Sequence, residues 1–281
     1  MNILYCGDKN IADGLIISVL SLMKNIPEQL NIYVLTMKCS TGERDFEPLS
    51  REFAEYMDNL LKRTNPKSSL QLIDITELFQ AEVPLANMDT RFTPGCMVRL
   101  FADSIDSLPD KILYLDNDVV CRGDISDFYN TDMHGAEMAG VLDYYGKWFF
   151  RRNIFKMDYL NSGVLLLNLK MIKDTALFSK ARERCRTKQM FMPDQSALNK
   201  LSVSKLKFPR RYNEQRKLRD DTLLQHFTTS FRFFPWFHSV TVKPWQIDKV
   251  HTVLRLHEYD ELLSRYQEVK EQYKINRTGE I

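Results

Sequence analysis

Two carboxylates separated by one residue are the strongest chemical signal in this sequence of 281 residues. Asp116 and Asp118 follow the apolar run 111–115, which predicts a buried strand. In an extended chain, residues i and i+2 point to the same side, so both carboxylates can converge on one cation. Two such ligands suit Mg²⁺ or Mn²⁺, which keep coordination positions open for substrate phosphates. The spacing predicts a metal site; a turn in which Asp116 caps a loop is the alternative.

A lysine in the last fifth of the chain is a second signal. Lys243 precedes Pro244 and Trp245, and a proline fixes the backbone of such a loop. Its ammonium group is a compact point charge that can pair with a diphosphate. A surface lysine before a proline needs no function by itself, so this interpretation depends on the carboxylates.

The elements that must position these side chains alternate along residues 2–75, as parallel strands with right-handed crossovers require. No segment rich in Pro, Gly or Ser divides the chain. We predict an α/β fold with a mixed, mainly parallel sheet: a domain over 1–246, and a helical tail over 247–281 that packs on it or extends it. The expected strands are 2–6, 30–35, 70–75, 111–115, 160–169 and 222–227, and the expected helices are 11–20, 43–62 and 247–273.

Sheets of this kind bind ligands beyond the C-terminal ends of their strands. We therefore expect the chemistry to lie after Cys6, after Leu115 and near His226. No GxGxxG motif follows the first strand and no GxxxxGK[ST] motif occurs, which argues against a dinucleotide dehydrogenase and a P-loop enzyme.

Composition indicates a globular protein, because 44% of the residues are hydrophobic and 27% are charged. The longest purely apolar stretch, 164–167, is far shorter than the roughly 20 residues of a membrane helix. The N-terminus has no basic lead, and the five cysteines form no CxxC pair, so we expect a cytoplasmic protein without disulfides. Residues 200–219 hold eight Lys or Arg against the single Glu214, which predicts either a solvated basic face or contact with an anionic ligand or membrane surface.

Four motifs then occur in order, and together they resemble glycosyltransferase family 8, which includes glycogenin and bacterial lipopolysaccharide galactosyl- and glucosyltransferases. The motifs are Tyr-Leu-Asp-Asn-Asp at 114–118, Tyr-Leu-Asn-Ser-Gly-Val at 159–164, Asp-Gln at 194–195 and a histidine followed by Lys-Pro-Trp at 243–245. The segment 3–11 is similar to the family's uridine-binding opening, so the resemblance runs from residue 1 to about 245. It implies a GT-A fold, a UDP-sugar donor, a divalent cation (usually Mn²⁺) and retention of anomeric configuration.

The resemblance also implies roles for particular residues. The nucleotide would be held by Cys6, Gly7, Asp8, Asn10, Ile11, Arg99, Asp116, Asn117, Asp118 and Lys243. The donor sugar would be surrounded by Asp143, Asn161, Asp194 and Gln195, with Gln195 near the anomeric carbon. Ile11 stands where relatives often have a tyrosine stacked on the base. Asn161 could instead shape a turn, and Asp194 could cap the helix that follows it.

The third metal ligand is where the sequence departs from the family pattern. Relatives place a histidine five or six residues before Lys-Pro-Trp, directly after a strand. His226 follows a strand but lies farther from Lys243, whereas His238 has nearly the right spacing but follows an aromatic segment. We favour His226, with 230–237 as an insertion, and keep His238 as the alternative. His134, His251 and His257 have no such context and are expected at the surface.

The resemblance predicts a retaining hexosyltransferase that uses UDP-glucose or UDP-galactose with Mn²⁺ or Mg²⁺. The acceptor would be a glycan or lipid-linked saccharide at the cytoplasmic membrane face, reached by peripheral contact, and no nucleic-acid partner is expected. The aromatic stretches 144–150 and 231–237 are the acceptor-site candidates. A UDP-sugar-binding protein without transferase activity and a nucleotide-sugar hydrolase are the alternatives.

Overall fold

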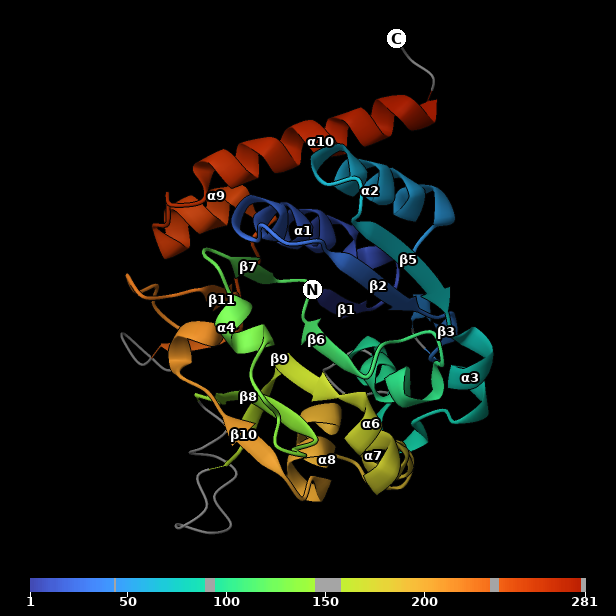
Figure 1. Cartoon of the computed structure of the whole chain (residues 1–281). Helices are drawn as coiled ribbons and strands as arrows, with labels where there is room; N and C mark the ends of the chain where they lie inside the picture. Colours follow the sequence, from blue (N-terminus) through green and yellow to red (C-terminus); the bar gives the residue numbers. More distant parts are fainter. Residues whose placement is uncertain (43, 89–93, 145–157, 233–237, 279–281) are drawn as a thin grey trace.

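The structure is a computed structural model, and it describes residues 1–42, 44–88, 94–144, 158–232 and 238–278. Its centre is a seven-stranded sheet (Figure 1). In sheet order the strands are β10 (Lys205–Lys207), β8 (Met138–Leu142), β9 (Leu160–Asn168), β6 (Lys111–Leu115), β1 (Asn2–Cys6), β2 (Asn31–Thr36) and β5 (Ser69–Asp74). Only β9 runs antiparallel to its neighbours, β6 and β8. The predicted mixed, mainly parallel α/β sheet is confirmed.

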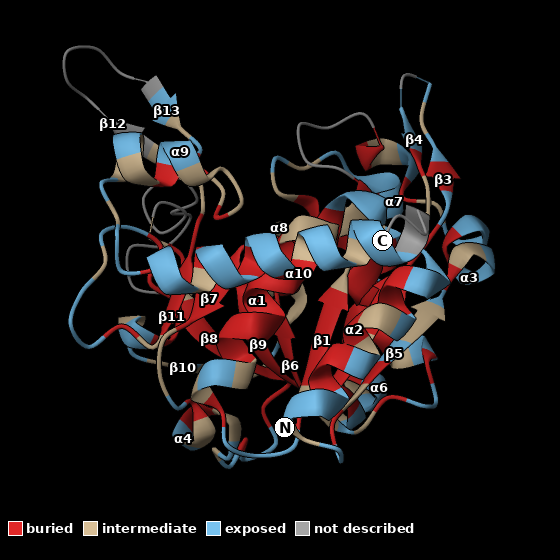
Figure 2. Ribbon diagram, turned by 90° about the horizontal axis from the view of Figure 1, so that it is seen from above, coloured by how far each residue is buried: buried red, intermediate tan, exposed pale blue. Residues whose placement is uncertain are grey.

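Two layers of apolar side chains cover the faces of this sheet, because successive residues of a strand point to opposite faces. On β1, Ile3 and Tyr5 belong to one core while Leu4 belongs to the other. All three are fully buried, as expected for a strand covered on both faces. Figure 2 shows this buried sheet beneath exposed outer helix faces.

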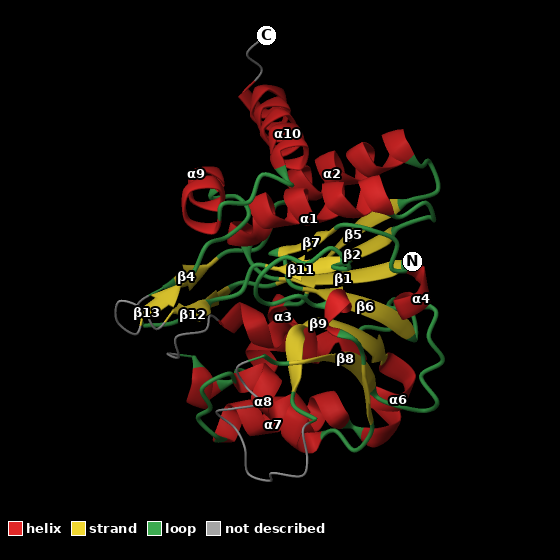
Figure 3. Cartoon of the chain, turned by 90° about the vertical axis from the view of Figure 1, so that its left-hand side faces the viewer, coloured by secondary structure: helices red, strands yellow, loops and turns green. Residues whose placement is uncertain are grey.

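Helices form the outer layers (Figure 3). One face is covered by α1 (Ala12–Asn25) and α2 (Arg51–Thr64), and α10 (Asp260–Thr278) lies outside these two helices. The core on the other face is completed by α3 (Thr76–Ala81), the 3₁₀ helix η3 (Pro94–Ser104), α6 (Leu169–Thr175), α7 (Leu177–Thr187) and α8 (Pro193–Leu201). Short helices lie at η1 (Lys9–Ile11), η2 (Leu85–Asn87), α4 (Ser126–Tyr129), η4 (Arg210–Tyr212) and α9 (Ile247–Lys249).

The predicted helix over 43–62 begins late, at Arg51. The Ser50 side chain accepts a hydrogen bond from the Phe53 N–H at 3.2 Å, which caps the first turn. The preceding residues pair instead as a small hairpin of β3 (Cys39–Ser40) and β4 (Asp45–Phe46).

The C-terminal tail is helical but not continuous. After α9 the chain forms a wide helical turn, η5 (Val250–Leu254), and reverses at Arg255, whose φ of 55° is left-handed. The following helix, α10, lies across α1 and α2 (Figures 1 and 2). Its Tyr273 ring packs against Phe53, and the Tyr56 hydroxyl donates to the Val269 carbonyl at 2.9 Å. The tail therefore shares a core with the rest of the chain.

Two further small sheets complete the fold. The predicted strand at 222–227 is present as β11 (Leu224–His226), but it pairs with β7 (Val119–Cys121) outside the main sheet. Directly after it, β12 (Ser230–Arg232) and β13 (His238–Val240) form a hairpin. Among the residues that the structure describes, no helix combines the length and apolar composition that a bilayer crossing requires.

Candidate functional site

Strand ends bring the motif residues to one edge of the main sheet. Because β1 and β6 are parallel, the segments after Cys6 and Leu115 leave the sheet at the same edge. Antiparallel β9 begins where β6 ends, which places Asn161 and Ser162 beside Asp116. The short β11 then runs antiparallel to β7, with His226 opposite Val119.

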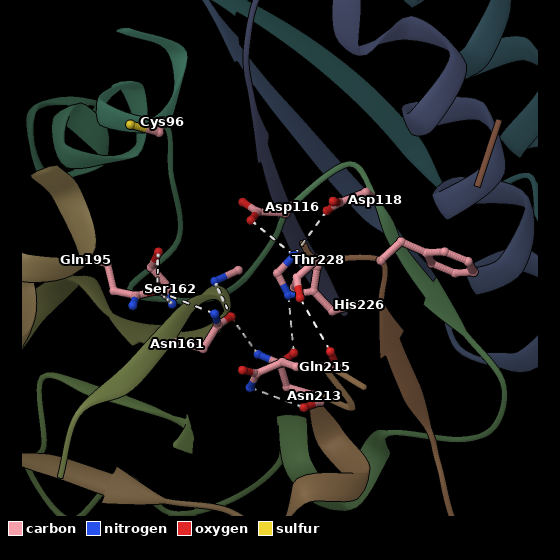
Figure 4. A network of polar contacts seen from close by, with 12 residues as sticks. Cys96, Asp116, Asp118, Asn161, Ser162, Gln195, Asn213, Gln215, His226 and Thr228 are labelled. Carbon is pink, nitrogen blue, oxygen red and sulfur yellow. Dashed lines mark hydrogen bonds and ion pairs between the residues drawn. The ribbon is translucent and has the colours of Figure 1, made fainter. Parts of the chain in front are cut away.

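Asp116, Asp118 and His226 converge at this edge (Figure 4). His226 Nε2 lies 3.2 Å from Asp118 Oδ1 and 3.5 Å from Asp116 Oδ2. The three ligand atoms lie within 4.8 Å of one another. His226 and Asp118 are buried, whereas Asp116 is partly exposed, so the group opens to solvent on the Asp116 side.

Lys243 and Arg99 supply positive charge to the two carboxylates. The Lys243 ammonium group contacts the Asp118 carboxylate and donates to the Phe227 carbonyl at 3.1 Å. Arg99 Nη2 donates to Asp116 Oδ1 at 2.9 Å, and its Nε lies 3.4 Å from Asp194 Oδ2. The buried guanidinium lies over the Tyr114 ring, with its central carbon 3.8 Å from the ring centroid.

A second polar network lies beside the triad. Asp143 Oδ2 accepts hydrogen bonds from Asn161 Nδ2 at 3.0 Å and from Gln195 Nε2 at 3.1 Å. Gln195 Oε1 accepts from the Ser162 backbone N–H at 2.9 Å. Three of the four residues that the resemblance assigned to the donor sugar are therefore joined through shared hydrogen bonds, whereas Asp194 lies beside Arg99.

Asn213, which the sequence analysis did not single out, connects the two groups. Its Nδ2 donates to Asn161 Oδ1 at 2.9 Å, and its Oδ1 lies 3.3 Å from His226 Nδ1. An amide oxygen only accepts, so His226 Nδ1 carries the proton and Nε2 faces the carboxylates. Asn213 lies in the basic segment 200–219, and nothing local marks it as buried.

Tyr114 was also not assigned a role, although its spacing could have indicated one. It stands two residues before Asp116, and its hydroxyl donates to Asp116 Oδ1 at 2.6 Å. Position i−2 in a strand lies on the same face as Asp116, so the sequence carried that signal.

The charges of the triad are mutually dependent. Burial would raise the pKa of Asp116, but Arg99 and then His226 outweigh it and hold that pKa well below its usual range. Against the same effect of burial, Lys243 and His226 lower the pKa of Asp118. Burial disfavours the imidazolium, yet Asp118 and Asp116 raise the pKa of His226 to about 9. Without a metal, the positive charge of a protonated His226 therefore partly balances the two carboxylates.

The donor set fits a divalent cation. It offers two ionised carboxylates and one imidazole nitrogen, ligands that Mg²⁺ and Mn²⁺ accept. Gly163 allows two of the ligands to lie against the backbone, because a Cβ there would lie 2.1 Å from His226 Cε1 and 2.7 Å from Asp116 Oδ2. The ligand set would be Asp116, Asp118 and His226.

The segment after β1 lies beside the Asp116–Asp118 loop. Asp8 caps η1, and the Asn10 side chain donates to Asp8 Oδ2 at 2.6 Å. A Cβ on Gly14 would lie 2.5 Å from the Asn117 carbonyl oxygen, so α1 closely approaches that loop. Ile11 is 8% exposed and packs in the core, and Cys6 and Gly7 lead from β1 into this turn.

Four further expectations concern His238, the aromatic stretches, the basic segment 200–219 and the cysteines. His238 lies on β13, opposite Arg232, and its side chain is outside the described residues, as are most of the aromatic stretches 144–150 and 231–237. The basic segment is partly engaged within the molecule. Arg210 pairs with Glu214, and the Arg216 guanidinium carbon lies 4.3 Å from the centroid of the Tyr144 ring. All five cysteines are free.

The mixed sheet with its helical layers matches the GT-A fold of the solved structures of LgtC. The chain belongs to glycosyltransferase family 8: the family's sequence model, Glycosyl transferase family 8, matches residues 2–249.

Relatives and solved structures agree with this family. A lipopolysaccharide 1,2-glucosyltransferase of Escherichia coli K12 is 28% identical over 272 residues, covering 87% of this chain and 75% of that protein. A lipopolysaccharide 1,3-galactosyltransferase of Salmonella typhimurium is 26% identical, covering 76% and 63%. The galactosyltransferase LgtC, solved in complex with donor and acceptor sugar analogs, has a TM-score of 0.65 at 19% identity, covering 94% and 96%.

Proposed function

We propose that this glycosyltransferase moves glucose or galactose from UDP-glucose or UDP-galactose to a glycan or lipid-linked saccharide, with retention of configuration and a divalent cation, Mn²⁺ or Mg²⁺. The observation that carries the proposal is the convergence of Asp116, Asp118, His226 and Lys243 next to the Asp143–Asn161–Gln195 network. In this proposal the first group would bind the diphosphate and the second, beside it, would bind the sugar. The glucosyl- and galactosyltransferase relatives support the two donor sugars.

In this proposal the segment 6–11 and Asn117 hold the nucleoside. The cation, when bound, would neutralise negative charge on the diphosphate. Lys243 adds a positive charge beside Asp118, and Arg99 orients Asp116 and Asp194. These charges are fixed before the reaction, which favours departure of UDP.

The hydrogen bonds of Gln195 favour attack from the face that UDP leaves. A covalent intermediate would need a nucleophile, and Gln195 Oε1 already accepts from the Ser162 N–H at 2.9 Å. Its amide is held by Asp143 and Ser162, so its proposed role is to stabilise the positive charge that develops at the anomeric centre. The leaving phosphate would take the acceptor's proton, while Asp194 positions the sugar.

A donor screen tests the function. The protein is incubated with UDP-glucose, UDP-galactose and other UDP-sugars in Mn²⁺, Mg²⁺ or EDTA, and released UDP is measured before and after addition of a glycan-acceptor array. We expect acceptor-dependent release with one hexose donor in Mn²⁺, and NMR of the product should show the donor's anomeric configuration. Binding without release would indicate a sugar-nucleotide-binding protein, and full release without acceptor would indicate a hydrolase.

The acceptor and the membrane require a separate test. We propose that the acceptor is presented at the cytoplasmic membrane face and that the enzyme contacts this surface peripherally. Co-sedimentation with anionic and neutral vesicles, with and without a lipid-linked acceptor, measures that contact. Absence of the protein from every vesicle pellet would contradict it.

A further inference from the structure

A second group of metal-ligating side chains lies apart from the candidate active site. In the ranges that the structure describes, two groups of three His, Cys, Asp or Glu residues bring their ligand atoms within 4.8 Å. One is the Asp116 triad, and the other consists of His251, His257 and Asp260. Asp260 is the first residue of α10, and the two histidines lie in the turn before it.

Both imidazoles of this second group face one carboxylate. His251 Nε2 lies 2.7 Å from Asp260 Oδ1, and His257 Nδ1 lies 3.3 Å from Asp260 Oδ2. The two rings are stacked, with centroids 4.7 Å apart and planes 15° from parallel. The side chains are 31%, 66% and 53% exposed for His251, His257 and Asp260, so an ion could enter directly from solvent.

The backbone around the group is well anchored. The left-handed Arg255 reverses the chain, and the Leu256 N–H donates to the Val250 carbonyl at 3.2 Å. Val250 and Tyr259 are buried in the core on either side of this reversal. The histidines are therefore brought together by a folded turn, which lowers the entropy cost of gathering three ligands.

We propose that His251, His257 and Asp260 form a second cation site, for a divalent ion of the Zn²⁺ class, that fastens α10 to the preceding turn. Two imidazoles, one carboxylate and a water form a ligand set that zinc adopts, whereas Mg²⁺ prefers oxygen ligands. Ligands about 2.0–2.1 Å from a tetrahedral zinc lie roughly 3.4 Å apart. The His257–Asp260 spacing of 3.3 Å is close to this value, and the His251–Asp260 spacing of 2.7 Å is shorter. Because the two rings are stacked, one imidazole must rotate before both nitrogens can point at one ion.

The surrounding charge also favours a cation. Glu258 and Glu261 flank Asp260 in the sequence, and only part of their charge is offset, since Lys24 pairs with Glu261 at 2.6 Å. In addition, the Tyr259 ring packs on Phe227, and its hydroxyl contacts the Gln225 side chain. These two residues flank His226, so the fastened turn supports the strand that carries it.

Zinc stoichiometry tests the proposal independently of the transferase function. The full chain is dialysed against Zn²⁺ or Mn²⁺, and bound metal is measured by mass spectrometry and calorimetry. Wild type should bind two zinc ions, and His257→Asn and Asp260→Asn one each. Removal of an outer-shell partner typically weakens metal binding by roughly 10- to 100-fold. Because these variants remove a direct ligand, their zinc affinity at this site should fall by at least as much.

Two control variants separate the sites. His134→Asn removes another exposed histidine that faces a single carboxylate, Asp132, at 3.2 Å, and it should still bind two zinc ions. Asp118→Asn should lose the other site and keep the one at His257. Unchanged zinc binding in His257→Asn, or a single wild-type zinc that Asp118→Asn removes, would overturn the proposal. Zinc should also raise the melting temperature of Asp118→Asn but not of a variant that also lacks His257.

Discussion

Asn213 Oδ1 lies 3.3 Å from His226 Nδ1, and this contact joins the proposed metal ligand to the sugar-binding network. Through Nδ2, the same amide donates to Asn161 Oδ1 at 2.9 Å. Asn213 is completely buried, so neither bond can be replaced by bulk water. One amide therefore fixes the orientation of residues on both sides of the site.

We predict that Asn213→Ala weakens Mn²⁺-dependent UDP binding about 10- to 100-fold, as loss of partners behind metal ligands does. It also leaves His226 Nδ1 without its acceptor, with a stability loss of about 1–3 kcal/mol. Calorimetry of UDP with and without Mn²⁺, together with urea unfolding, measures both effects. Asn213→Asp retains the acceptor for His226 but faces Asn161 Oδ1 with an oxygen. If the alanine variant binds UDP like wild type, Asn213 has only a packing role.

Asp118→Asn should weaken UDP binding in Mn²⁺ and leave the weak binding in EDTA unchanged, because the diphosphate would bind largely through the cation. A titration of UDP on both proteins, with Mn²⁺ and with EDTA, measures this. Equal Mn²⁺-dependent affinities would remove the metal-site interpretation.

For the stability of the metal-free protein, the structure and the sequence predict opposite effects of Asp118→Asn. Two neighbouring carboxylates alone predict repulsion, so loss of one charge should raise stability. In the structure Asp118 contacts Lys243 and His226, and these cations lower its pKa. We therefore expect Asp118→Asn to lower the free energy of unfolding in EDTA, measured by urea unfolding at neutral pH. An increase would mean that repulsion dominates.

Metal-free stability should fall as the pH rises from 6.5 to 9. The folded pKa of His226 is raised to about 9 from an unfolded value of 6.5, so protonation favours the folded state. Its contribution is complete below pH 6.5 and is lost as the pH passes through 9; the shift corresponds to a contribution on the order of 3 kcal/mol. Urea unfolding in EDTA across this range should show the decline in wild type. His226→Gln should show a flatter profile, and an equal decline in both proteins would assign it to other groups.

Gly163→Ala should disrupt the triad without changing any charge. Its Cβ would lie 2.1 Å from His226 Cε1, so the imidazole must move away from the carboxylates. We expect loss of Mn²⁺-dependent UDP binding and a stability cost of about 1–3 kcal/mol from overpacking. Gly42→Ala is the matched control, because no atom lies within 4 Å of its added Cβ. Binding by Gly163→Ala equal to that of the control would show that the close approach is unimportant.

Local patterns in the sequence determined five strands of the main sheet and the order of the motifs, whereas β8 and β10 were not among the expected strands. The apolar runs at 2–6 and 111–115 became β1 and β6 with those bounds. A strand that is buried on both faces is a continuous apolar run, so it can be recognised from its own residues alone. The i and i+2 spacing predicted that Asp116 and Asp118 meet, but they do so in a turn between β6 and β7, where the Val119 N–H donates to the Asp116 carbonyl at 3.1 Å, and not in an extended strand. Strand alternation in 2–75 likewise determined the parallel pairing of β1, β2 and β5.

Only the tertiary structure decided which distant side chains meet. His226 reaches the carboxylates because β11 pairs with β7, and Asn213 is buried because the chain before β11 returns past Asn161. The break of the tail at Arg255 and the pairing of His251 with His257 likewise depend on burial of Val250 and Tyr259 in a core built by other elements. Hydrophobic periodicity indicates the secondary structure and the buried face of one segment. Hydrogen bonds and charge pairs between segments form only after packing brings those segments together.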